Sequence, residues 1–156
     1  MPEKNSILFV CTANQCRSPM AEAIFKKYIS KMDPEETWVI ESAGTWTLPG
    51  YPATPYGVKA MLEMGLDTSK HKSQPITAAL LERFLLILTM EHGHKEAIQV
   101  EFPKIANRVF LLSEMAGENI PVLDPIGGTY QQYINTSNEI DSWIVKGLPK
   151  ILELTK

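Results

Sequence analysis

A cysteine and an arginine lie close together near the amino terminus, at Cys11 and Arg17, with five residues between them. This segment follows an apolar run and precedes a helical pattern that opens near Arg17 and Ser18, so it is predicted to join a strand to a helix. In open parallel sheets, ligands bind beyond the carboxyl ends of strands, and a helix N-terminus presents free amides to anions. Arginine can close such a loop through bidentate contacts. The spacing therefore predicts a site for a phosphate-like dianion.

Cys11 is the candidate nucleophile of this loop. Nearby cationic and dipolar groups favour the thiolate, which is the reactive form of cysteine. The alternative is a small apolar side chain that ends a strand. That alternative leaves Arg17 and the polar Asn14 unexplained, because buried polar groups need hydrogen-bond partners.

Cys16 is the only other cysteine. It is either a packed loop residue or a redox partner that captures oxidised Cys11 as a disulfide. Two cysteines make no disulfide framework, and residues 1–10 lack a signal peptide's apolar region, so a cytoplasmic protein is expected. We expect no metal site, because the three histidines are distant in sequence from the cysteines: His71, His92 and His94.

Asp124 opens the loop DPIGG at residues 124–128. An Asp-Pro pair followed by glycines is common turn chemistry. Beside a Cys-x5-Arg motif, a loop aspartate can also supply the proton that a phosphomonoester's leaving group needs. Asp124 is therefore predicted to be a general acid, with a simple turn as the alternative.

The elements that must position these residues alternate between strands and helices. Four apolar runs are typical of buried strands, at residues 6–10, 38–40, 84–88 and 109–112. Helical spacing follows Pro19, recurs from Thr54 to Gly65, and is longest from Tyr130 to Ile151. This alternation predicts an α/β domain with parallel strands and right-handed crossovers.

Composition limits the function classes. The 156 residues suffice for one domain, residues 1–156, and 44% of them are hydrophobic. The apolar runs are far shorter than the roughly 20 residues that cross a bilayer. A net charge of −3 argues against binding nucleic acid or anionic lipid through net charge.

Four segments together resemble the low-molecular-weight protein tyrosine phosphatase family: FVCTANQCRSPMAEAIF at residues 9–25, ESAGT at 41–45, HKSQPIT at 71–77 and LDPIGG at 123–128. They occur in the family's order and cover essentially the whole chain. The resemblance implies a three-layer, Rossmann-like α/β fold of the phosphatase-I type, with a four-stranded parallel sheet between helices. It also implies phosphorylated protein substrates and no metal or organic cofactor, and we expect a monomer or weak dimer.

The family's two-step mechanism can be transferred residue by residue. Cys11 would attack phosphorus, Arg17 would hold the phosphoryl oxygens, and Asp124 would protonate the leaving group. Asp124 would then activate the water that hydrolyses the cysteinyl-phosphate. The phosphate-binding loop would comprise Thr12, Ala13, Asn14, Gln15, Cys16 and Ser18.

The resemblance also implies a supporting network of Asn14, Ser18, Ser42 and His71. Asparagine tolerates left-handed backbone geometry, which suits a tight loop. Without the matched segment, His71 would be interpreted as a surface or capping histidine. His92 and His94 are predicted to be solvent-facing helix residues.

Three positions differ from the family's tyrosine-specific members. Ala13 replaces a usual glycine, and Ile126 stands where aromatic residues wall the substrate ring. Thr12 replaces a bulky aliphatic residue; the bacterial protein-arginine-phosphatase branch carries threonine there together with a DP-x-GG loop. Thr12 can equally just fill space. Trp46 and Tyr51 either line the pocket rim or pack their own loop.

Several functions remain in competition. Phosphotyrosine and phosphoarginine are nearly equal as substrates of a cysteine-dependent protein phosphatase. Arsenate reduction usually needs further cysteines to relay a disulfide, and none follows Cys16. A non-catalytic phosphoprotein-binding module would keep the loop without the chemistry, whereas a redox switch between Cys11 and Cys16 would add regulation to the phosphatase.

Overall fold

The computed structural model describes residues 2–156. One sheet contains four parallel strands in the order β2-β1-β3-β4, formed by β1 (Glu3–Cys11), β2 (Val39–Gly44), β3 (Phe84–Thr89) and β4 (Val109–Leu111). The α-helices are α1 (Arg17–Met32), α2 (Pro55–Glu63), α3 (Ala78–Glu82), α4 (His92–Glu101) and α5 (Tyr130–Thr155). Two short 3₁₀ helices are η1 (Pro103–Arg108) and η2 (Leu112–Ala116).

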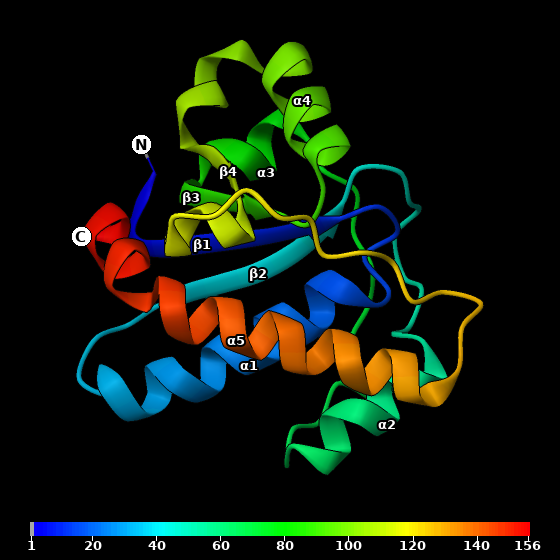
Figure 1. Cartoon of the computed structure of the whole chain (residues 1–156). Coiled ribbons are helices and arrows are strands. Elements are labelled where there is room, and N and C mark those ends of the chain that lie inside the picture. Colours follow the sequence, from blue (N-terminus) through cyan, green and yellow to red (C-terminus); the bar gives the residue numbers. More distant parts are fainter. Residues whose placement is uncertain (1) are drawn as a thin grey trace.

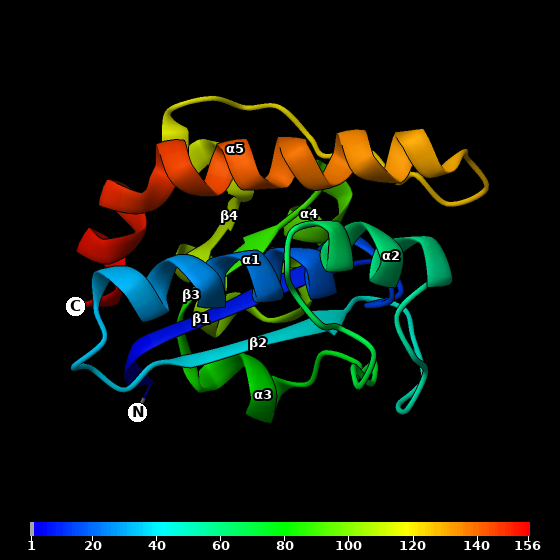
Figure 2. The same ribbon diagram turned by 90° about the horizontal axis from the view of Figure 1, so that it is seen from below.

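The helices form two layers around the sheet. Helices α1, α2 and α5 pack against one another below the sheet in Figure 1, and α3 and α4 lie above it. Figure 2 shows α5 and α3 on opposite sides of the strands. The predicted three-layer α/β fold with a four-stranded parallel sheet is therefore confirmed. Within residues 2–156, no helix is both long and apolar enough to cross a membrane.

Strand β1 lies at the centre of the molecule because both of its faces are apolar. Ile7 and Phe9 pack into a core shared with α1 and α5, whereas Leu8 and Val10 pack into a second core with α3 and α4. Successive side chains of a strand point to opposite faces, so burial on both faces requires an unbroken apolar run. The same run carries Cys11 to the carboxyl edge of the sheet.

Some predicted boundaries were wrong. The second strand extends through Gly44 rather than ending at Ile40, because the polar segment from Glu41 to Gly44 pairs with β1 up to Cys11. The 3₁₀ helices and the five-residue α3 were not predicted, since such short elements carry too little apolar periodicity. The first helix begins at Arg17, as predicted.

Gly44 lets the end of β2 support the loop that follows β1. A side-chain carbon at this position would lie 2.6 Å from the Thr12 carbonyl oxygen, which is closer than real contacts allow. The amides of Thr45 and Trp46 donate to the carbonyls of Cys11 and Thr12, at 3.0 and 2.9 Å. The ESAGT segment therefore holds the start of the loop against the sheet.

Candidate active site

The loop of residues 12–16 joins the carboxyl end of β1 to the first turn of α1. Within the part of the chain that the structure describes, its backbone amides donate to no protein acceptor. Asn14 has φ = 56°, in the left-handed region. Loops of this kind turn successive amides into an anion-binding concavity, and the N-terminus of α1 adds partial positive charge. The departure at Ala13 is accommodated, because Asn5 and Asn14 are the only non-glycine residues of 2–156 with positive φ.

Cys11 lies at the base of this loop and is 2% exposed. Its sulfur is 3.0 Å from the hydroxyl oxygen of Ser18, which itself accepts from Asn14 Nδ2 at 2.8 Å. The Ser18 proton is therefore free to donate, either to the sulfur or to the Ala43 carbonyl at 3.4 Å. The Cys11–Ser18 contact can therefore form with the Ser18 hydroxyl as its donor.

Asn14 is fully buried and organises the residues beneath the loop. Its Nδ2 also donates to Ser42 Oγ at 2.9 Å, and its backbone carbonyl oxygen lies 2.6 Å from His71 Nε2. The predicted network of Asn14, Ser18, Ser42 and His71 is thus brought together. Two further members were not predicted, although both lie in segments that carry the resemblance: Glu22 accepts from Ser42 at 2.7 Å, and the Gln74 amide donates to Asn14 Oδ1 at 2.9 Å.

Arg17 is buried, with 1% of its surface exposed. Its Nη1 donates to Glu91 Oε2 at 2.6 Å and to the Val122 carbonyl at 2.8 Å. These contacts fix the plane of the guanidinium and leave Nη2 beside the loop. Sequence reasoning missed Glu91; its one signal is its position just after β3, at the sheet edge where Cys11 also lies.

Asp124 is both a turn residue and a neighbour of the guanidinium. Its Oδ1 accepts from the Ile126 amide at 3.0 Å, and its Oδ2 lies 3.5 Å from Arg17 Nη2. Cys11 and Arg17 from one segment, and Asp124 from a distant one, therefore meet at one edge of the sheet.

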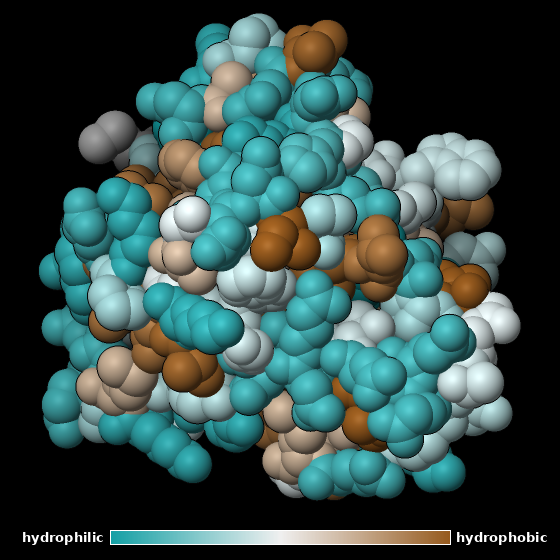
Figure 3. Space-filling view, in the orientation of Figure 1, coloured by the Kyte–Doolittle hydropathy of each residue, from teal (hydrophilic) through white to brown (hydrophobic). Residues whose placement is uncertain are grey.

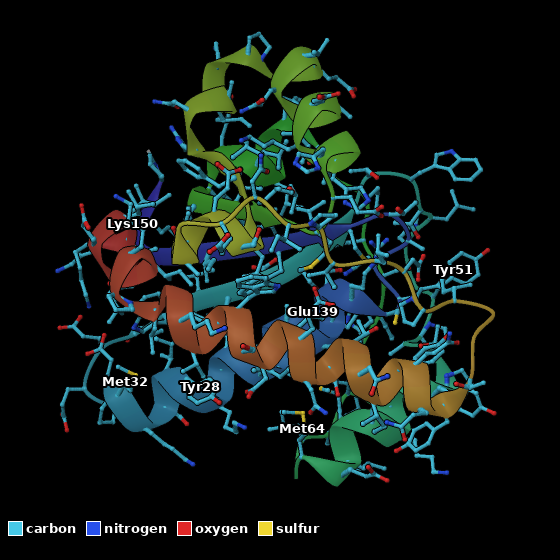
Figure 4. The ribbon with its side chains drawn as sticks, viewed as in Figure 1. Tyr28, Met32, Tyr51, Met64, Glu139 and Lys150 are labelled. Atoms are coloured by element: carbon cyan, nitrogen blue, oxygen red, sulfur yellow. The ribbon has the colours of Figure 1, made fainter. Side chains whose placement is uncertain are left out.

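A cleft of about 680 Å³ opens above the loop. Trp46 is 84% exposed on its rim, opposite the loop that carries Asp124 and Ile126. Tyr51 also lines the cleft, and Figure 4 shows its side chain pointing outward from the sheet. The walls of the cleft are therefore more apolar than its phosphate-loop floor.

The family model for low molecular weight phosphotyrosine protein phosphatases matches residues 6–153. The chain belongs to this family. A protein-arginine-phosphatase of Bacillus subtilis (strain 168) is 38% identical over 148 residues, covering 94% of this chain and 96% of the relative. The tyrosine phosphatase PtpB of Staphylococcus aureus is also 38% identical, over 90% of this chain and 94% of the relative. The resemblance found in the sequence is confirmed.

A solved structure of the YwlE arginine phosphatase, from a cysteine-to-serine mutant with a phosphorylated active-site serine, has a TM-score of 0.87 to this chain. The two are 38% identical, and the match covers 95% of each chain.

Cys16, the second cysteine of this family member, is buried among the side chains that α1 and α5 enclose. Burial, reinforced by the nearby charges of Cys11 and Asp124, raises the pKa of its thiol to about 12. At neutral pH, Cys16 is therefore a protonated core residue and not a competing nucleophile.

The prediction that His94 faces solvent was wrong. Its side chain is buried: Nε2 lies 2.8 Å from Thr12 Oγ1, and Nδ1 accepts from the Glu91 amide at 3.1 Å. The first turn of α4 follows β3 directly, which places one side of that turn against the phosphate loop. His92, two residues earlier, is exposed as predicted and bonds Asn119.

His94 should make folding stability depend on pH. Burial and the Arg17 charge lower its pKa to about 4, against the opposing charges of Glu91 and Asp124. As the pH falls, His94 therefore binds a proton near pH 6.5 in the unfolded chain but only near pH 4 in the folded chain. The contribution of His94 to the free energy of unfolding should be present in full above pH 6.5. It should be lost as the pH falls towards 4, by up to about 1.4 kcal/mol per pH unit.

Urea unfolding between pH 8 and 4 measures this effect. His94→Gln should remove that part of the decline, whereas His92→Leu should keep it. Equal declines in the wild type and His94→Gln would contradict the assignment.

Proposed function

We propose that this chain is a cysteine-dependent protein phosphatase in which Cys11 is the nucleophile. The observation that carries the proposal is the position of the Cys11 sulfur. It lies at the carboxyl end of the central strand, 3.0 Å from the Ser18 hydroxyl, at the base of the loop that leads to the buried Arg17. Within residues 2–156, the amides of that loop donate to no protein acceptor. The phosphorylated serine in the YwlE mutant supports covalent phosphorylation at such a site.

The reaction has two steps. The Cys11 thiolate forms a bond to phosphorus while the bond to the leaving group breaks, and Asp124 supplies the leaving group's proton. Arg17 and the loop amides hold the three equatorial oxygens as charge redistributes. Asp124 then takes a proton from water, which displaces the sulfur and releases phosphate. Glu91 and Val122 hold the Arg17 guanidinium in place through both steps.

The substrate is a protein-bound phosphoresidue, and two observations favour phosphoarginine over phosphotyrosine. Ile126 lines the cleft in place of an aromatic wall, which reduces ring stacking. Thr12 presents a hydroxyl, held by His94, on the cleft floor. The relatives include both protein-arginine and protein-tyrosine phosphatases, so phosphotyrosine remains the second candidate.

Thr12→Ile should change this preference. The larger side chain fills the cleft floor and removes the hydroxyl, so hydrolysis of phosphoarginine peptides should fall relative to phosphotyrosine peptides by about tenfold or more. Rates for both peptides, measured side by side with wild type and variant, give the ratio. An unchanged ratio would show that Thr12 does not set specificity.

We further propose a single-domain enzyme, residues 1–156, that acts in the cytoplasm as a monomer or weak dimer. Both cysteines are free thiols, which supports a reducing compartment. On the face shown in Figure 3, hydrophobic residues lie as separate groups among hydrophilic ones and form no single large apolar patch. Tight binding of a phosphopeptide without turnover would instead indicate a non-catalytic binding module.

A further inference from the structure

Thr12 and His94 form a hydrogen-bonded pair that the two-step reaction does not use. Thr12 is half-buried at the floor of the cleft, and His94 lies behind it on the first turn of α4. The oxygen of one and Nε2 of the other are 2.8 Å apart. The two residues are far apart in the sequence, so only the fold brings them together.

The second ring nitrogen determines which atom donates. Nδ1 of His94 accepts the Glu91 backbone amide at 3.1 Å, so in the neutral ring the proton must be on Nε2. The neighbouring Arg17 guanidinium opposes a second proton on this ring. His94 therefore donates to Thr12 Oγ1 and cannot accept from it.

The direction of the Thr12 hydroxyl follows from its own contacts. One lone pair of Oγ1 receives the His94 proton, and Arg17 Nη2 lies on the same oxygen at 3.5 Å. Both neighbours are donors, so the Thr12 proton must be given to a third group. Thr12 lines the cleft, and the phosphoryl group would bind there as the strongest acceptor.

We propose that His94 is a positioning residue, which holds Thr12 Oγ1 so that the Thr12 hydroxyl donates to the phosphoryl group in the loop. This inference rests on the proposed function, since it gives the loop one further donor to the transferred group. Glu91 joins the two halves of the arrangement, because its carboxylate holds Arg17 at 2.6 Å while its amide holds His94.

A double-mutant cycle with p-nitrophenyl phosphate tests the proposal. Thr12→Val removes the hydroxyl but keeps the shape, and His94→Leu removes the ring donor. Each should lower kcat/KM by about tenfold, as expected for losing or misdirecting one hydrogen bond. The double variant should be no slower than Thr12→Val, because His94 acts only through that hydroxyl. His92→Leu, on the same helical turn, should match the wild type.

Two kinetic outcomes would overturn the proposal. One is a double variant slowed by the product of the two single losses, which would show independent effects. The other is a His94→Leu variant that melts as the wild type does and also turns over as fast.

NMR of the histidine rings tests the direction of the His94–Thr12 hydrogen bond directly. It needs neither turnover nor a folded His94 variant. In wild type at pH 7, the His94 ring should carry its proton on Nε2, and the Nε2 resonance should shift in Thr12→Val and on adding inorganic phosphate. A ring protonated on Nδ1 would overturn the inference. A wild-type chain that shows these signals but hydrolyses no phosphate ester would contradict the proposed function alone.

Discussion

Cys11→Ser should reduce phosphate ester hydrolysis by at least about 10,000-fold, on the scale observed when a catalytic nucleophile is removed. A hydroxyl at this position is far less acidic than a thiol, so it attacks phosphorus poorly even with Ser18 nearby. The fold should survive, because serine is no larger than cysteine. It can also keep the hydrogen bond to Ser18, whose hydroxyl oxygen lies 3.0 Å from the Cys11 sulfur in the wild type. Affinity for inorganic phosphate should change little, since Arg17 and the loop amides remain.

Steady-state rates with p-nitrophenyl phosphate measure this effect, and thermal melting confirms the fold. Cys16→Ser is the matched variant: it makes the same change in the same loop at a side chain that packs into the core. It should cost no more than about tenfold. Turnover retained in Cys11→Ser, or an equal loss in both variants, would refute the role of Cys11 as nucleophile.

Asp124→Asn should slow the reaction according to the leaving group. Asparagine can keep the hydrogen bond from the Ile126 amide that shapes the turn, which is 3.0 Å long in the wild type. It has no acidic proton to donate. Phenyl phosphate, with a poor leaving group, should react at least about 100-fold more slowly, within the range for general acid catalysis. p-Nitrophenyl phosphate needs little protonation and should lose about tenfold or less.

The comparison of the two esters isolates the acid role from the turn. Asn135→Ala, on α5 behind the same loop, serves as a control for loop disturbance and should slow neither ester appreciably. A uniform loss across both esters in Asp124→Asn would show that Asp124 acts through loop shape or charge rather than proton donation.

Local features of the site were predictable because they depend on neighbours in the chain. The apolar run before Cys11, the helix start at Arg17 and the left-handed Asn14 all belong to one continuous segment. Asp124 was recognisable because an Asp-Pro-Ile-Gly-Gly sequence forms a turn wherever it occurs. For Ser42 and His71, the indication came from the resemblance rather than from the residues themselves.

The partners that fix the orientation of the loop side chains were not predictable. In the sequence, Glu91 resembles a solvent-exposed charge and His94 resembles part of a polar helix face. In the structure, Glu91 holds Arg17 and His94 holds Thr12. Glu22 and Gln74 likewise meet the Asn14 network from separate elements.

The sequence by itself determined the chemistry that this protein carries: a cysteine and an arginine on one strand-loop-helix segment, a turn aspartate, and apolar runs long enough for a parallel sheet between helices. Only the tertiary structure decided how those groups are oriented. The carboxyl ends of parallel strands converge at one edge, so residues that follow β1, β2 and β3 become neighbours although long stretches of chain separate them. Hydrogen bonds across that edge depend on packing and register, which no local pattern encodes.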